Sequence, residues 1–270
     1  MNTLQLSNGV QMPAIGLGLW RVTDEKELIN AVKAAHEVGY THFDSAQIYG
    51  NEAMLGRAWK QLGVDRSSLF ITTKLWNDNQ DLDNIGESFD QSLKDLQTDY
   101  VDLFLIHFPV TETRHAAWRI GMQDIYKSGR AKAIGVSNYT IKHLEEMKAW
   151  GLLPTVNQVE LHVYLQQLEL LKYCADHGIV VEAYSPLAHG QGLDNDVLES
   201  IARKHNKSVA QIMIRWCIEV GTVPLPKSVH PDRIRENFDV FDFALDVDDM
   251  QQITELDQNL RTCWDPTNIA

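Results

Sequence analysis

A repeated alternation of short apolar segments with longer amphipathic ones limits the fold of this chain more than any other feature. Eight of the apolar segments are predicted strands: Ile15–Leu19, His42–Ser45, Leu69–Thr73, Val101–His107, Ala133–Val136, Val156–Glu160, Val180–Tyr184 and Val223–Pro226. Most are nearly continuous apolar runs, which is typical of parallel strands buried on both faces. The segments between them show helical spacing, as in residues 25–38, where Gly39 has the position of a C-cap.

The alternation runs through the chain without a Pro- or Ser-rich linker. It predicts one α/β domain over residues 1–270, a closed (β/α)8 barrel of the TIM type, with a doubly wound parallel sheet as the alternative. Ser7-Asn8-Gly9 stands between two short apolar stretches and predicts an N-terminal β-hairpin. We expect a short C-terminal tail after Leu260.

The charge balance narrows the range of partners. The chain carries 24 Lys and Arg residues against 37 Asp and Glu, a net charge of −13 at pH 7 with His neutral. Such a surface repels phosphate polymers, so we expect no nucleic-acid partner and no binding to an anionic membrane. No apolar run approaches the roughly 18 residues of a bilayer span, and residues 1–5 lack the features of a secretory signal.

Three widely spaced cysteines, Cys174, Cys217 and Cys263, are expected to be free thiols in a cytoplasmic protein. No Cys/His cluster predicts a metal site.

Polar residues at successive strand ends are the candidate catalytic groups. Asp44 ends the second predicted strand, Lys74 the third and His107 the fourth, and Tyr49 follows Asp44 at the start of the next helix. In a barrel, the carboxyl ends of neighbouring strands meet at one rim, where the active site lies. Each residue alone has a simpler explanation, such as an N-cap or a surface lysine. Together they predict a catalytic site.

The chemistry of these four groups suggests a role for each. A free tyrosine has a pKa of about 10, too high for efficient proton transfer near neutrality. We expect the Lys74 ammonium to lower the pKa of Tyr49, and Asp44 to keep Lys74 charged. Tyr49 would then exchange a proton with a substrate oxygen, which His107 orients by a hydrogen bond.

The residues around these positions resemble the aldo-keto reductase superfamily. The matching segments are, in order, DSAQIYGNE (residues 44–52), KLWN (74–77), LIHFP (105–109), AIGVSNY (133–139), NQVE (157–160), YSPL (184–187) and PLPKS (224–228). The resemblance covers the whole chain and is closest to bacterial-type members such as the 2,5-diketo-D-gluconate reductases. It implies a barrel enzyme, a monomer, that reduces aldehydes and ketones with NADPH. Retention of His107, which steroid double-bond reductases of the family replace with Glu, favours carbonyl reduction.

The resemblance also implies how NADPH/NADP+ would be held. Ser137, Asn138 and Gln158 would bind the nicotinamide carboxamide, Tyr184 would stack on the ring, and Ser185 and Leu187 would run along the pyrophosphate. In place of a glycine common in relatives, Ala188 follows Leu187. Gly16-Leu17-Gly18 lacks the third glycine and the acidic partner of a dinucleotide fingerprint.

The adenosine 2′-phosphate would be bound before a predicted helix that begins at Pro231. Lys227, Ser228 and Arg233 would contact this phosphate, since helix N-termini and Arg attract phosphate groups. Glu236 and Asn237 would face the adenine or ribose.

The substrate pocket is predicted to have aromatic walls, made by Trp20, Ile48, Trp76, Phe108 and Trp264, beside Tyr49 and His107. Trp20 and Trp76 are equally compatible with a core role. Two other functions stay open. One is an NADPH-binding relative with a structural or regulatory role and little turnover. The other is an unrelated phosphate-binding barrel enzyme, which the lack of Gly after Lys227-Ser228 disfavours.

Overall fold

A computed structural model describes residues 2–269, and in it the predicted strands form one parallel sheet. In the described residues the sheet has eight strands in the order β10-β9-β8-β7-β6-β5-β4-β3. They are β3 (Leu17–Gly18), β4 (His42–Asp44), β5 (Phe70–Leu75), β6 (Val101–Ile106), β7 (Ala131–Ser137), β8 (Val156–Glu160), β9 (Val180–Tyr184) and β10 (Val223–Leu225). The neighbours in the sheet are neighbours in sequence, as a barrel requires.

Two backbone hydrogen bonds join the first and last strands and close the barrel. The Gly16 N–H donates to the Pro224 carbonyl and the Gly18 N–H to the Pro226 carbonyl, each at 3.1 Å. A Cβ atom on Gly18 would lie 3.0 Å from the Leu225 carbonyl oxygen, so glycine permits this close approach. The (β/α)8 barrel prediction is confirmed, and the doubly wound alternative is wrong.

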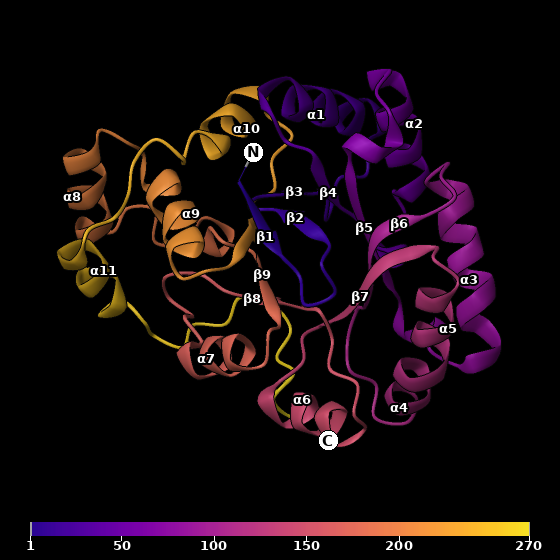
Figure 1. Ribbon diagram of the computed structural model, residues 1–270. Helices are drawn as coiled ribbons and strands as arrows, with labels where there is room; N and C mark the ends of the chain where they lie inside the picture. Colours follow the sequence, from indigo (N-terminus) through magenta and orange to yellow (C-terminus); the bar gives the residue numbers. More distant parts are fainter. Residues whose placement is uncertain (1, 270) are drawn as a thin grey trace.

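The predicted hairpin forms from β1 (Thr3–Gln5) and β2 (Gln11–Pro13), and lies across the barrel in the view of Figure 1. Leu6 and Met12 pack in a cluster with barrel residues that include Phe70, Leu103 and Val156. Because Phe70 and Val156 are the first residues of β5 and β8, the hairpin covers the amino end of the barrel. The opposite end is left for the polar strand termini.

Helices surround the strands (Figure 1). They are α1 (Glu25–Val38), α2 (Glu52–Leu62), α3 (Leu82–Asp95), α4 (Arg114–Ala116), α5 (Gln123–Lys127), α6 (Ile141–Ala149), α7 (Leu168–Asp176), α8 (Asp196–His205), α9 (Val209–Glu219), α10 (Pro231–Phe238) and α11 (Val247–Thr254). The Asp24 side chain caps α1 by accepting from the Glu27 N–H, and Gly39 ends it at φ 114°.

The structure departs from the simple alternation at two places. Residues Ala117–Met122 form a π-helical stretch between α4 and α5, and two helices, α8 and α9, separate β9 from β10. Gly121 in the π-helical stretch faces Ile85 of α3, where an added Cβ would lie 2.4 Å from the Ile85 Cδ1 atom. The stretch therefore lets α3 and the following segment approach closely.

Among the described residues, no helix is both long and apolar enough to cross a membrane.

Candidate active site

Tyr49 is held above the barrel rim by a tight turn. It ends a 3₁₀ turn at Gln47–Tyr49, and Gly50 follows at φ 65°, a left-handed conformation that favours glycine. The buried Asn51 side chain secures this segment: its amide nitrogen donates to the Leu19 and Val22 carbonyls at 2.9 and 3.0 Å. The turn directs the phenol back toward β5, where Lys74 lies.

Asp44, Lys74 and Tyr49 form one continuous chain of contacts. Lys74 Nζ lies 2.6 Å from Asp44 Oδ1 and 3.3 Å from the Tyr49 hydroxyl oxygen. It also donates to the Ser45 carbonyl at 2.9 Å. Lys74 is completely buried and Asp44 nearly so. A buried ammonium needs such acceptors, because its desolvation is otherwise costly.

The charges of this trio follow from its burial. Burial alone would lower the pKa of Lys74, but the negative charge of Asp44 and the contact with Tyr49 raise this pKa above its ordinary value. Lys74 therefore stays charged. Burial raises the pKa of Tyr49, and the opposing effect of Lys74 does not cancel it. The expected net lowering of the Tyr49 pKa is thus wrong for the protein alone, although the effect of Lys74 has the expected sign.

His107 follows β6 and faces Tyr49. The two ring centroids are 5.6 Å apart and the planes meet at 80°. Burial, with a smaller contribution from the Lys74 charge, lowers the pKa of His107 well below its ordinary value. The imidazole is therefore neutral at physiological pH and can offer a single N–H to a substrate oxygen.

An aromatic wall adjoins His107. The Trp76 ring centroid lies 5.3 Å from that of His107, and Trp264 from the C-terminal tail lies within 6 Å of both Trp76 and Phe108. Trp264 is 51% exposed, as expected for a side chain that lines an open site. Trp20 is partly exposed and contacts the His189 ring, and Ile48 is 46% exposed. Neither Trp20 nor Trp76 is a buried core residue.

The predicted carboxamide-binding residues lie together at the ends of β7, β8 and β9. The Ser137 hydroxyl donates to the Gln158 carbonyl at 2.9 Å, and the Tyr184 hydroxyl donates to Asn138 Oδ1 at 2.7 Å. Asn138 has a left-handed backbone, φ 65°, and its amide nitrogen donates to the His107 carbonyl at 3.0 Å. These bonds connect the amide cluster directly to the backbone of His107.

The loop after β9 carries the predicted pyrophosphate residues. Ser185 and Ala188 have positive φ values, 51° and 47°, and Leu187 lies between them. The Ser185 hydroxyl oxygen lies 3.2 Å from His189 Nε2 and 3.5 Å from Cys263 Sγ, so this loop meets the C-terminal tail. Non-glycine residues with positive φ values cluster at ligand-binding sites, so the conformation of this loop agrees with the predicted role.

The predicted phosphate-binding residues gather at the start of α10. Pro231 is its first residue, and the Ser228 hydroxyl accepts from the His230 N–H at 3.1 Å. Lys227 and Arg233 are exposed, and neither has an ion pair within the described part of the chain. Farther along α10, Glu236 is partly exposed and Asn237 is buried.

Comparison with known proteins decides the family. Residues 14–258 match the model of the aldo/keto reductase family. The chain belongs to this family.

Two curated bacterial relatives of this aldo-keto reductase are named for their substrates. The glyoxal reductase of Bacillus subtilis (strain 168) is 46% identical over 99% of this chain and 97% of its own length. The methylglyoxal reductase DkgA of Escherichia coli (strain K12) is 46% identical over 99% of this chain and 98% of its own length.

A solved structure supports the same assignment. The aldo-keto reductase of Bombyx mori in complex with NADP is 34% identical and superposes with a TM-score of 0.90, over 96% of this chain and 94% of that one. This aldo-keto reductase is therefore an oxidoreductase that acts on carbonyl groups, and the alternative of an unrelated phosphate-binding barrel enzyme is wrong.

Three buried or strained groups near the site were given no role from the sequence, although Glu160 was noted as a polar residue at a strand end. Glu182 of β9 and Glu160 of β8 are both fully buried. His189 contacts Cys263 Sγ at 3.0 Å through Nε2. The signal for Glu182 is its place in the strand: in Val180–Tyr184 it shares with Tyr184 the face directed into the barrel.

Glu160 holds the tail against the barrel. Its Oε1 atom accepts from the Thr262 N–H at 2.7 Å and its Oε2 atom from the Cys263 N–H at 3.2 Å. Burial would raise the pKa of Glu160, but hydrogen bonds from His162 and Thr262 hold it below its ordinary value. The ionised carboxylate thus fixes the backbone that precedes Trp264.

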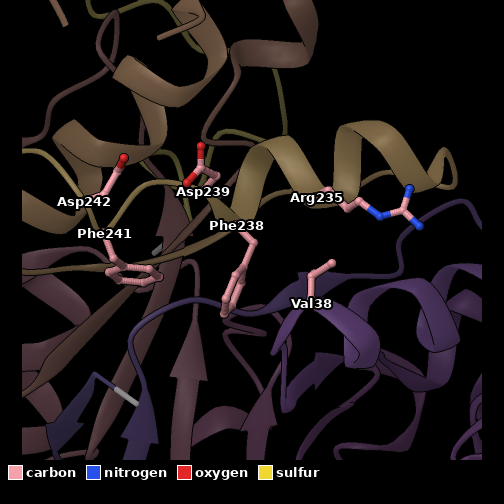
Figure 2. Close-up of a pocket in the computed structure, with 6 residues that line it drawn as sticks. All are labelled: Val38, Arg235, Phe238, Asp239, Phe241 and Asp242. Atoms are coloured by element: carbon pink, nitrogen blue, oxygen red, sulfur yellow. The ribbon is translucent and has the colours of Figure 1, made fainter. Parts of the chain in front are cut away.

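The surface depression drawn in Figure 2 lies elsewhere. Val38, Arg235, Phe238, Asp239, Phe241 and Asp242 line it. These residues come from the carboxyl ends of α1 and α10 and the segment after α10 (Figure 2), and none is a predicted site residue. Within residues 2–269, no group of three His, Cys, Asp or Glu side chains is arranged to bind a metal.

Proposed function

We propose that this protein reduces small aldehydes and ketones to alcohols with NADPH, with Tyr49 as the proton donor. The observation that carries this proposal is the chain of contacts from Asp44 through Lys74 to the Tyr49 hydroxyl, next to the neutral ring of His107. A carbonyl oxygen placed between Tyr49 and His107 would meet one proton donor and one hydrogen-bond donor.

The protonation states suit reduction. Burial keeps Tyr49 protonated near neutral pH, so the phenol is ready to give its proton as negative charge develops on the substrate oxygen. The Lys74 ammonium then stabilises the phenolate that remains, and Asp44 keeps that ammonium charged. In the oxidative direction the same residues would accept a proton.

The amide cluster fits a nicotinamide carboxamide. When bound, NADPH supplies the hydride. The Gln158 amide nitrogen donates to Asp44 Oδ2 and Glu182 Oε2, so its oxygen Oε1 is the atom left to accept from a carboxamide N–H. Ser137 and Asn138 lie beside it, and the Tyr184 ring would stack on the nicotinamide.

The remainder of the nucleotide would follow the rim. Ser185 and Leu187 would contact the pyrophosphate through their strained loop. Lys227, Ser228 and Arg233 would bind the 2′-phosphate at the start of α10, where the helix dipole adds to the two cationic charges. Glu236 and Asn237 would lie under the adenosine.

The substrates we propose are 2-oxoaldehydes and aromatic aldehydes. The names of the two bacterial relatives favour the first class, and the Trp76, Phe108 and Trp264 rings favour the second. Trp20 and Ile48 would complete the pocket. We also propose that residues 1–270 act as one domain, as a monomer, in the cytoplasm.

A substrate and coenzyme panel tests the proposal. Initial rates are measured with NADPH and with NADH on phenylglyoxal, methylglyoxal, an aromatic aldehyde, an aldose and a 3-ketosteroid. We expect turnover of the first three compounds with a preference for NADPH. An absence of turnover with every carbonyl compound, despite NADPH binding in a fluorescence titration, would instead favour the non-catalytic alternative.

A further inference from the structure

The orientation of the Gln158 amide is determined by two carboxyl groups inside the barrel. Gln158 Nε2 lies 3.0 Å from Asp44 Oδ2 and 2.9 Å from Glu182 Oε2. Both amide hydrogens therefore have acceptors, and turning the amide over would place its oxygen against the ionised Asp44 carboxylate. Among the contacts of residues 2–269, Gln158 Oε1 has no hydrogen-bond donor.

Glu182 is a buried carboxyl group with no charged partner among the described residues. It is fully buried, and the only basic side chain within ion-pair distance in the described chain is His42, whose Nε2 atom is 3.5 Å from Glu182 Oε1. Burial lowers the pKa of His42 to about 3, so that ring is neutral. The nearby Lys74 is engaged by Asp44. Burying an ionised carboxyl group without a charged partner costs folding free energy. The other polar contact of Glu182 is the hydrogen bond that it accepts from Gln158.

The protonation state of Glu182 is compatible with its role as an acceptor. Burial and the neighbouring Asp44 charge raise the pKa of Glu182. Both effects favour the neutral acid, whose carbonyl oxygen still accepts from Gln158. When Glu182 is neutral, the charged groups beside it are those of the Asp44–Lys74 ion pair.

We propose that Glu182 is a positioning residue of the coenzyme site, which together with Asp44 holds the Gln158 amide with its oxygen turned toward the nicotinamide carboxamide. The proposal rests on the proposed function, since it requires that NADP(H) binds here. Without Glu182, one Gln158 hydrogen loses its acceptor and the amide plane is held at one point only. The affinity of the site for a coenzyme with a carboxamide N–H donor, relative to one without this donor, would then fall.

The test compares NADP+ with its 3-acetylpyridine analogue, in which an acetyl group replaces the carboxamide and removes the N–H donor. Dissociation constants for both are measured by tryptophan fluorescence. We expect the wild type to bind NADP+ about five- to tenfold more tightly than the analogue, the range of one net hydrogen bond. In Glu182→Met this ratio should fall to about two or less, mainly through weaker binding of NADP+.

Two further variants separate positioning from a structural role. Glu182→Gln should restore the wild-type ratio, because its amide oxygen accepts from Gln158 as the acid does. Val181→Ala alters the neighbouring residue, which packs in the cluster outside the barrel, and should lower the melting temperature while leaving the ratio unchanged. Glu182→Ala replaces Glu182→Met if the latter fails to fold.

The outcomes are distinct. A wild-type ratio in Glu182→Met or Glu182→Ala, or an equal loss of the ratio in Glu182→Gln, overturns the positioning role. Equal wild-type affinities for the two dinucleotides also overturn it, while leaving the proposed reductase function intact. A wild type that binds neither dinucleotide overturns the proposed function and the positioning role together.

Discussion

The Lys74 ammonium donates to the Tyr49 hydroxyl oxygen across 3.3 Å, inside a site where Lys74 is fully buried and Tyr49 is partly buried. The contact couples the charge of the lysine to the acidity of the phenol. Since burial raises the pKa of Tyr49 and Lys74 lowers it, the ammonium has its largest effect when the proton leaves. The same contact makes the charge of Lys74 important for stability.

Removal of Lys74 should destabilise the fold. Lys74→Met leaves Asp44 buried without its counter-ion, and the free energy of unfolding should fall by about 3–5 kcal/mol. The double variant Asp44→Asn/Lys74→Met should recover part of this loss, since no uncompensated charge remains. Urea denaturation measures both. A double variant less stable than Lys74→Met would contradict this explanation, and Lys172→Met at the surface is the control.

The contribution of His42 and His107 to stability should fall as the pH drops below about 6.5. His42 and His107 titrate near 6.5 in the unfolded chain, whereas burial holds both pKa values lower in the folded state, that of His42 at about 3. At these two sites the unfolded state therefore binds more protons, and each histidine costs up to about 1.4 kcal/mol per pH unit.

Urea denaturation between pH 7 and pH 4.5 checks this dependence. His107→Gln should show a shallower decline in the free energy of unfolding than the wild type. Replacement of the exposed His115 by Gln should leave the slope unchanged. Identical slopes for wild type and His107→Gln would be evidence against a depressed His107 pKa.

Coenzyme preference should depend on two cations before and within α10. Lys227→Ala and Arg233→Ala should each raise the dissociation constant for NADPH roughly 10- to 100-fold, the range of one charge-assisted hydrogen bond, and change that for NADH little. Arg235→Ala is the matched control, because Arg235 lies on the same helix but pairs with Asp232. An equal rise of the NADPH dissociation constant in all three variants would contradict binding of the 2′-phosphate by Lys227 and Arg233.

The C-terminal tail should detach when Glu160 is neutralised. In Glu160→Gln, the two tail N–H groups lose a charged acceptor, so we expect faster tryptic cleavage after Arg261 and a higher KM for aromatic aldehydes. Mass spectrometry of the digest locates the cut. Glu145→Gln, which changes an exposed ion pair, should behave as the wild type. Unchanged cleavage in Glu160→Gln would show that other contacts hold the tail.

The sequence was sufficient for the barrel because its main signals are local. Apolar runs and helical spacing predict strands and helices, and strand direction alone brings Asp44, Lys74 and His107 to one rim. The observed strand limits differ from the predicted ones by only a few residues. For example, β5 extends to Leu75 and therefore includes Lys74.

What the sequence did not predict depends on contacts between distant segments. Glu160 binds residues about a hundred positions later, and Gln158 donates to both Glu182 and Asp44, which are far apart in the sequence. The direction of the Tyr49 pKa shift also needed the structure, because it reflects the balance between burial and one ammonium.

The most direct test of the central claim is the hydride-transfer rate of Tyr49→Phe. Single-turnover oxidation of NADPH by phenylglyoxal should slow by about 10²- to 10⁴-fold, the range expected for loss of a general acid, while NADPH affinity stays within about twofold. Tyr126→Phe, at an exposed tyrosine of α5, should react as the wild type. A Tyr49→Phe enzyme that transfers hydride at the wild-type rate would contradict the role of Tyr49 as the proton donor.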